Sequence, residues 1–181
     1  MNQPITDTYK QKLKDQIKIV QDMDLGVELM YQVASWMKSN GLNYATWWDP
    51  KNMNQDFLLQ HSEPNEYFVA IIDNKPVASV ILQETERNQS WKSVDGNYPK
   101  KALYIHWLCV NRNYSGIGLS KKMIEFAEIQ GKKRGFEKLR LDTDADEPKL
   151  CNLYKSLGFK EMGIENEDGK NTIFFEKLIP H

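Results

Sequence analysis

Apolar residues along the chain recur with two spacings, one typical of strands and one typical of helices. Residues 102–110 are almost all apolar or aromatic and are bounded by polar turn residues, which predicts a short strand buried on both faces. Leu119, Met123, Phe126 and Ala127 then recur at the spacing of one helix face. We therefore expect a central strand that leads through a glycine-containing turn into an amphipathic helix.

The same spacings predict the remaining elements on either side of this strand. Further strands are predicted at residues 16–20, 66–72, 76–83, 138–142, 159–164 and 172–178. Further helices are predicted at residues 22–41, 55–60 and 148–158. The second and third strands, and the last two, are joined by turn residues, so each pair is expected to form an antiparallel hairpin. This order predicts an α/β fold, a three-layer α/β/α domain with a mixed, mostly antiparallel sheet.

Length and composition indicate an ordinary globular domain. The 181 residues fit one domain, and no Pro/Gly/Ser-rich stretch divides them. Residues 1–14 are polar and carry no motif, so we expect an N-terminal arm, frayed or loosely helical, before a single domain at residues 15–181. Residues 87–101 form a long polar stretch of a kind that is commonly functional or mobile.

Charge and the metal-binding residue types exclude several classes of protein. A formal net charge of −1 predicts neither a nucleic acid nor a membrane surface as a partner. No apolar run approaches a membrane span and the N-terminus lacks the apolar core of a secretory signal, so we expect a cytoplasmic protein. Cys109 and Cys151 lack disulfide or metal spacing, and His61, His106 and His181 are scattered. We therefore expect reduced thiols and no metal site.

The turn after the central strand carries the most plausible binding chemistry. Gly116 and Gly118 lack side chains, so the backbone there can approach a ligand closely, and the positive end of the following helix faces the same spot. An anion such as a diphosphate would bind there without a basic side chain. Ordinary turn chemistry would explain the same glycines, and this alternative stays open on the turn alone.

A dinucleotide-binding domain is a second interpretation of the same turn. Asp142 follows Gly118 at nearly the spacing of the acidic residue in that fold. However, the third glycine of the motif is replaced by Lys121, and the turn follows the fourth predicted strand rather than the first. The sequence therefore disfavours this interpretation.

Aromatic residues in predicted loops are candidates for acceptor binding. Trp47 and Trp48 are adjacent in a loop at residues 43–54, and Trp91 lies in the long polar stretch. Large aromatic side chains either pack down on the core as a lid or line a substrate pocket, where they attract a cationic amine. Both interpretations remain open for these three tryptophans.

Three segments, at residues 110–123, 139–143 and 153–159, together resemble the GNAT superfamily of acyl-CoA-dependent N-acetyltransferases. The resemblance is strong over residues 103–163 and extends by topology over residues 16–178. It implies a GNAT-like fold, acetyl-CoA (coenzyme A) as co-substrate without a metal, and transfer of the acetyl group by direct attack of a primary amine. The amine would belong to a small molecule or a peptide, and a homodimer is one oligomeric state that the sequence leaves open.

The resemblance assigns coenzyme binding to the strand end and the turn. The family turn carries Arg or Gln, two residues, Gly, one residue, and Gly or Ala, and the matching positions here are Ser115, Gly118 and Ser120. Only the central glycine is kept strictly, so we expect weaker or reshaped coenzyme binding rather than its loss, since backbone N–H groups do not depend on residue type. The implied coenzyme-binding residues are Leu108, Cys109, Val110, Ser115, Gly116, Ile117, Gly118, Leu119 and Ser120. A family asparagine is replaced by Glu147, with Asn152 as a substitute candidate.

The resemblance and the residue chemistry together give candidate catalytic groups. Tyr154 matches a tyrosine that serves many family members as the general acid toward the departing thiolate; alternatively, it only covers an apolar helix face. An amine of pKa near 10.4 must lose its proton before attack, which contributes about 4 kcal/mol to the barrier at neutral pH. His106, expected on one strand face with Tyr104 and Leu108, and Glu84 are the candidate bases, although a lone histidine in an apolar run is often a core residue.

A non-catalytic alternative belongs to another class of function. The departures at Ser115, Ser120 and Glu147 leave open an acyl-CoA-binding sensor or interaction module that keeps the coenzyme site and has lost acceptor chemistry. Such a protein would bind the coenzyme and release no free thiol when an amine is supplied.

Overall fold

The computed structural model describes residues 7–42, 46–87, 90–167 and 169–180 of the chain. Its strands are β1 (Lys18–Gln21), β2 (Tyr67–Ile72), β3 (Lys75–Gln83), β4 (Leu103–Val110), β5 (Lys138–Asp144), β6 (Lys160–Glu167) and β7 (Lys170–Leu178). Its α-helices are α1 (Asp7–Asp15), α2 (Met23–Ser39), α3 (Gln55–Leu58), α4 (Lys92–Asp95), α5 (Leu119–Lys133) and α6 (Pro148–Ser156). Within the described part of the chain, no helix is both long and apolar enough to cross a membrane.

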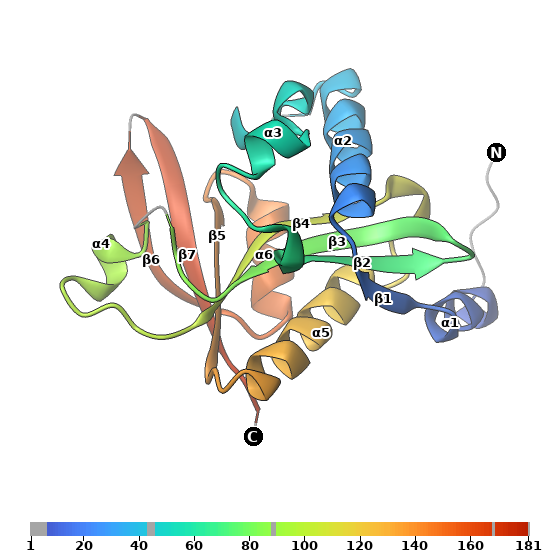
Figure 1. Cartoon of the computed structure of the whole chain (residues 1–181). Coiled ribbons are helices and arrows are strands. Elements are labelled where there is room, and N and C mark those ends of the chain that lie inside the picture. Colours follow the sequence, from blue (N-terminus) through green and yellow to red (C-terminus); the bar gives the residue numbers. More distant parts are fainter. Residues whose placement is uncertain (1–6, 43–45, 88–89, 168, 181) are drawn as a thin grey trace. The chain divides into compact units, whose positions relative to one another are not determined.

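The seven strands are hydrogen-bonded in the order β1-β2-β3-β4-β5-β7-β6 (Figure 1). Strand β4 pairs with β5 in parallel, whereas β1 with β2, β2 with β3, β5 with β7 and β6 with β7 are antiparallel. The mixed, mostly antiparallel sheet predicted from the element order is therefore confirmed. The chain separates into two compact units, the first at residues up to 81 and 107–123, and the second at residues 82–106 and from 124 onward.

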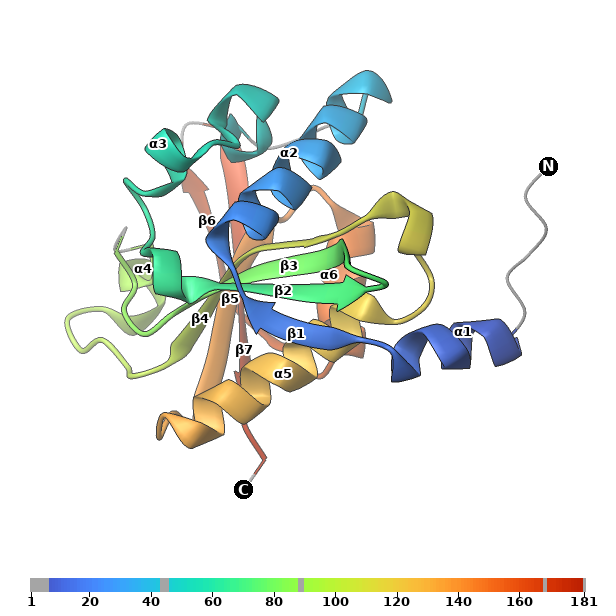
Figure 2. The ribbon, with the colours of Figure 1, turned by 45° about the vertical axis from the view of Figure 1, so that its right-hand side comes forward.

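The core of the first unit lies where α2 packs across β2 and β3 (Figure 1, Figure 2). Leu29, Met30 and Val33 of α2 are buried against Tyr67 of β2 and Ile81 of β3. The helical spacing of α2 gathers its apolar residues on the face that meets the strands, so burial of this face stabilises the unit.

Two residues set the position of α2. Asp22 caps the helix as the sequence predicts, because its carboxylate accepts a hydrogen bond of 3.0 Å from the Leu25 N–H. Gly26 allows the close approach to the strands: a Cβ atom there would lie 3.1 Å from the Tyr67 ring and 3.2 Å from the Ser79 hydroxyl. A side chain at position 26 would therefore fit only if Tyr67 and Ser79 moved by a few tenths of an ångström.

The second unit is organised around a buried arginine on β5. The Arg140 side chain is fully buried and donates hydrogen bonds of 2.7 and 2.9 Å to the two carboxylate oxygens of Asp95. It also pairs with Glu176 of β7 at 2.9 Å, and its guanidinium lies 4.2 Å from the centre of the Trp91 ring. The charge of Arg140 is thus balanced by two carboxylates, which ties the segment around α4 to the sheet.

Three segments predicted to be irregular contain short helices. The N-terminal arm, predicted at residues 1–14 as frayed or loosely helical, forms most of the regular helix α1 (Asp7–Asp15), while residues 1–6 lie outside the described part. Residues 46–48 and 50–52 of the predicted loop form two 3₁₀ turns, and α4 interrupts the long polar stretch. These elements are held by contacts with distant residues, which local spacing does not reveal. The division into an arm and a single domain stays a prediction.

We predict that Asp95→Ala lowers the free energy of unfolding by about 3 kcal/mol, because Arg140 would keep a buried charge without its bidentate partner. Urea denaturation near neutral pH measures the change. Lys155→Ala is the matched control, since Lys155 and Glu161 form an exposed ion pair that contributes less than about 1 kcal/mol. Equal losses in the two variants would contradict the role assigned to Arg140.

The same carboxylate gives stability a predictable pH dependence. Burial alone would raise the pKa of Asp95, but hydrogen bonds from Arg140 and from the Lys100 N–H outweigh burial and lower it. The stabilisation is therefore fully present above the usual carboxyl pKa and is lost as the pH falls through the lower pKa of the folded state. Consequently, the difference between wild type and Asp95→Ala should shrink on acidification.

Candidate active site

The turn between β4 and α5 presents an exposed stretch of backbone. Gly116 and Gly118 adopt φ angles of +80° and +85°, a left-handed conformation that favours glycine. Ile117 and Leu119 alternate with them and are buried, so their side chains anchor the turn to the core. The Gly118 carbonyl accepts the Lys122 N–H at 3.1 Å and so starts α5.

The backbone N–H groups of this turn are available to a ligand. Within the described residues, those of residues 116–120 donate no hydrogen bond to another protein group. A Cβ atom on Gly116 would meet no heavy atom within 4 Å, so the space beside the turn is open. Exposed N–H donors at the positive end of a helix fit the diphosphate of coenzyme A. The predicted residues Ser115, Gly116, Ile117, Gly118, Leu119 and Ser120 all belong to this turn or to the first residues of α5.

The end of β4 leads directly into this turn. Leu108 and Val110 are half-buried, and Cys109 between them is buried. Burial raises the pKa of the Cys109 thiol to about 12, so this cysteine stays protonated and is a poor nucleophile. Trp107 has a φ of +47°, which marks a local break in the regular strand conformation just before Leu108. Among the described residues, no group of three or more potential ligands could hold a metal ion.

Tyr154 lies on α6 in the second unit. Its ring is buried, with the ring centres of Phe159 and Phe175 at 5.9 and 5.8 Å. Burial raises the pKa of its hydroxyl, and the nearby Asp142 and Cys151 raise it further. In the described part of the chain, the Tyr154 hydroxyl has no hydrogen-bond partner. A neutral phenol without a competing acceptor can donate its proton to a ligand.

Asp142 of β5 is a site residue that the sequence analysis did not assign to catalysis. Burial raises the pKa of its carboxyl group, while the charge of His106 acts in the opposite direction. His106 is half-buried on β4, and Asp142 also influences Tyr154. One feature of the sequence could have indicated a role for Asp142. It stands two residues after Arg140 and therefore lies on the same face of β5. Two ionisable residues on one face of a buried strand require partners.

The second candidate base is less enclosed than His106. The Glu84 side chain is 57% exposed and accepts a hydrogen bond of 3.4 Å from Arg134. Asn152 is exposed on α6, and Glu147 precedes that helix without capping it through its side chain. Their roles stay predictions.

The tryptophans predicted to bind substrate have different surroundings. Trp47 is 45% exposed, and its ring lies edge-on to His61 at 4.9 Å and near Trp107 at 6.3 Å. Trp48 packs against the core of the first unit. Trp91 is buried beneath α4 and lines a cavity of about 610 Å³ together with Tyr104. Trp47 is thus the one of the three that offers the most surface to a ligand.

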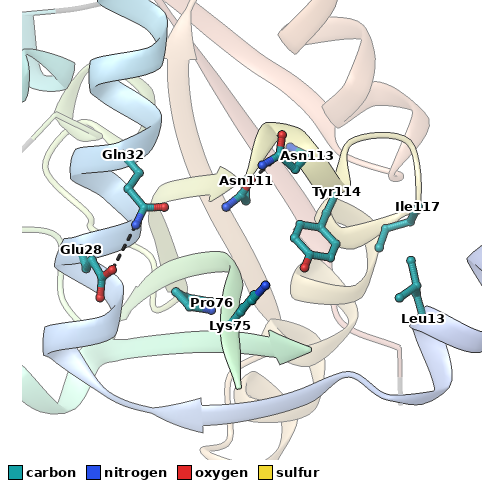
Figure 3. Close-up of a pocket in the computed structure, with 9 residues that line it drawn as sticks. All are labelled: Leu13, Glu28, Gln32, Lys75, Pro76, Asn111, Asn113, Tyr114 and Ile117. Carbon is teal, nitrogen blue, oxygen red and sulfur yellow. Dashed lines mark hydrogen bonds between the residues drawn. The ribbon is translucent and has the colours of Figure 1, made fainter. Parts of the chain in front are cut away.

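A cavity of about 470 Å³ lies in the first unit beside the turn (Figure 3). It is bordered by Asn111, Tyr114 and Ile117 from the turn and by Leu13 from α1. On the α2 side, Gln32 donates a hydrogen bond of 3.1 Å to Glu28 (Figure 3). The turn that exposes its N–H groups therefore also borders a hollow next to α1.

Comparison with known proteins gives a consistent result. Residues 47–159 match the model of the acetyltransferase (GNAT) family. An uncharacterized N-acetyltransferase, YesJ, from Bacillus subtilis (strain 168) is 27% identical over 165 residues, which cover 89% of this chain and 87% of that protein. The match lies over nearly the whole length of both proteins.

Two solved structures share the fold. An acetyltransferase of the GNAT family from Listeria monocytogenes 4b F2365 superposes with a TM-score of 0.69 at 24% identity, over 90% of this chain and 94% of that one. PaiA N-acetyltransferase from Thermoplasma acidophilum, solved in complex with coenzyme A, gives a TM-score of 0.63 at 19% identity, over 90% and 98% of the two chains. The predicted α/β GNAT-like fold is confirmed. Since the family model also matches more than half of the sequence, the chain belongs to the acetyltransferase (GNAT) family.

Proposed function

We propose that this acetyltransferase moves an acetyl group from acetyl-CoA to a primary amine of a small molecule or peptide by direct attack. The observation that supports this most is the row of unpaired N–H groups at residues 116–120, between and beside two left-handed glycines. The PaiA N-acetyltransferase that shares the fold was solved in complex with coenzyme A.

Acetyl-CoA supplies an acetyl group that is activated as a thioester. In this proposal, the N–H groups of residues 116–120 bind the diphosphate by charge-assisted hydrogen bonds. The backbone of Leu108, Cys109 and Val110 aligns the pantetheine arm in the manner of an added strand. Both contacts use main-chain groups, so the departures at Ser115 and Ser120 remove side-chain contacts only.

Tyr154 is the general acid of the proposal. Its hydroxyl donates a proton to the thiolate sulfur that is released when the amine takes the acetyl group. Because burial raises the pKa of Tyr154, the hydroxyl is protonated near neutral pH. The absence of a protein acceptor among the described residues leaves the proton free for this role.

His106 is the preferred base, and Glu84 is the alternative. His106 is half-buried and interacts with the Asp142 carboxylate, which stabilises the imidazolium formed when the amine proton is taken up. Glu84 is more exposed and already pairs with Arg134.

We assign binding of the acceptor amine to Trp47, whose exposed ring can attract a cationic amine before deprotonation. Trp48 and Trp91 support the surrounding segments.

We predict that the protein releases free thiol from acetyl-CoA in the presence of at least one amine from a panel of polyamines, aminoglycosides, amino acids and peptides. A thiol-reactive dye follows the release, and calorimetry follows coenzyme binding in parallel. Binding without thiol release for any amine would favour the sensor alternative. Absence of binding at millimolar coenzyme would exclude both functions.

The glycine conformation predicts a specific loss of coenzyme affinity. Gly118→Ala would place a side chain in a left-handed conformation, at a cost of about 1 kcal/mol that the turn can relieve by moving its N–H groups. We expect the Kd for coenzyme A to rise about tenfold in calorimetry. Gly169→Ala is the matched control, because Gly169 has a φ of +78° in the β6–β7 turn. Equal Kd values for the two variants would contradict this assignment.

The acid role predicts a change in turnover without a change in binding. Tyr154→Phe keeps the ring contacts with Phe159 and Phe175 and removes only the hydroxyl. We expect kcat to fall about 100-fold, while the Kd for coenzyme A stays within about twofold of wild type. Tyr31→Phe, at an exposed tyrosine of α2, should leave both values unchanged. An unaltered kcat in Tyr154→Phe would leave the tyrosine a packing role only.

A further inference from the structure

The last turn of α1 brings a lysine ammonium group to the start of α5. The Nζ and Cε atoms of Lys14 lie 3.9 and 3.7 Å from the position that a Cβ atom on Gly118 would occupy. No other heavy atom of the described residues, apart from the chain neighbours of Gly118, lies that near this position. Both residues belong to the first unit. The predicted N-terminal arm therefore reaches the turn to which coenzyme binding is assigned.

Packing of the preceding residue fixes this placement. Leu13 is buried and borders the same cavity as Ile117 and Tyr114 (Figure 3). Figure 3 shows the side chains of Leu13 and Ile117 next to each other, with Leu13 coming from α1 and Ile117 from the turn. Ile117 lies one residue before Gly118 and Leu13 one before Lys14, so the two buried residues that line this cavity directly precede the two residues that lie close together.

The end of α1 and the turn before α5 bring several positive groups together. The unpaired N–H groups of residues 116–120 and the dipole of α5 make the region positive, and Lys14 adds a full positive charge. Lys14 has no ion pair with any carboxylate in the described chain, and neighbouring Asp15 accepts a hydrogen bond from Gln11 instead. Positive groups gathered without a counter-charge form a site for an anion.

A lysine at the end of α1 could also serve that helix alone. Basic side chains in a last turn stabilise the negative end of a helix, and α1 carries two there, Lys12 and Lys14. This effect accounts for the residue type at both positions. It does not account for the approach of Lys14 to Gly118 or for the burial of the preceding residue, Leu13. Lys12 is therefore the natural control for Lys14.

We propose that Lys14 is a coenzyme-binding residue, whose ammonium group contacts the diphosphate together with the N–H groups of residues 116–120. This inference rests on the proposed function, because it takes acetyl-CoA as the ligand of the turn. It assigns α1 to the coenzyme site. An exposed lysine next to backbone donors adds charge neutralisation that N–H groups alone do not supply.

The test compares Lys14→Ala, Lys14→Glu and Lys12→Ala with wild type in calorimetric titrations with coenzyme A and with dephospho-coenzyme A, which lacks the 3′-phosphate. For Lys14→Ala we expect the Kd to rise about five- to tenfold for both ligands, with a larger rise for Lys14→Glu. The affinity of Lys14→Ala should also depend less on salt concentration. Lys12→Ala should stay within about twofold of wild type, and thermal melting should show all variants folded.

Two results would overturn the proposal while leaving the proposed function intact. One is a Kd for Lys14→Ala equal to that for Lys12→Ala. The other is a loss of affinity for coenzyme A without a loss for dephospho-coenzyme A, since that pattern would place Lys14 at the 3′-phosphate and away from the diphosphate. If wild type bound neither ligand, the proposed function would fail and the role of Lys14 would fail with it.

Discussion

The main constraint at the candidate site is the set of backbone N–H groups at the start of α5. A helix begins with backbone N–H groups that have no partner inside the helix, and here the N–H groups of residues 116–120 also find none elsewhere in the described protein. The side chains of Ile117 and Leu119 are buried and anchor the turn to the core. Hydrogen bonds to a charged acceptor are roughly twice as strong as neutral ones, so a diphosphate would replace water there with a gain. The donors that this turn could offer to a ligand are therefore main-chain groups.

Two ionisable residues of β5 in the second unit, Arg140 and Asp142, have different charged neighbours. Arg140 and Asp142 stand two residues apart on β5. Asp95 pairs with Arg140, and Glu176 with Lys138 and Arg140, and these interactions outweigh burial and lower the pKa of both carboxyls. Asp142 has His106 as its charged neighbour, and burial dominates and raises its pKa. A carboxylate with a raised pKa next to an imidazole is the arrangement expected at a site of proton transfer.

The sequence predicted the features that arise from local spacing. It did not predict contacts between residues that are far apart in the chain. Apolar runs and caps located β4, the cap at Asp22 and the helix that begins at Pro148, because each depends on residues within a few positions. The burial of Trp91 was not predictable, since it depends on Arg140, nearly fifty residues away. The turn at residues 115–120 could be located from its glycines, whereas the proximity of Asp142 to His106 follows only from the folded chain.

The two glycines of the turn share a left-handed conformation but have different surroundings. Nothing lies within 4 Å of a Cβ atom placed on Gly116, so the left-handed φ angle is sufficient to explain that residue. At Gly118 the same conformation is accompanied by Lys14, which occupies the side on which a side chain would project. The left-handed conformation therefore explains glycine at position 118 as well, and Lys14 lies there at ordinary contact distance. The polar segment before β1, which carries no sequence motif, therefore lies beside this turn, with Leu13 buried and Lys14 next to Gly118.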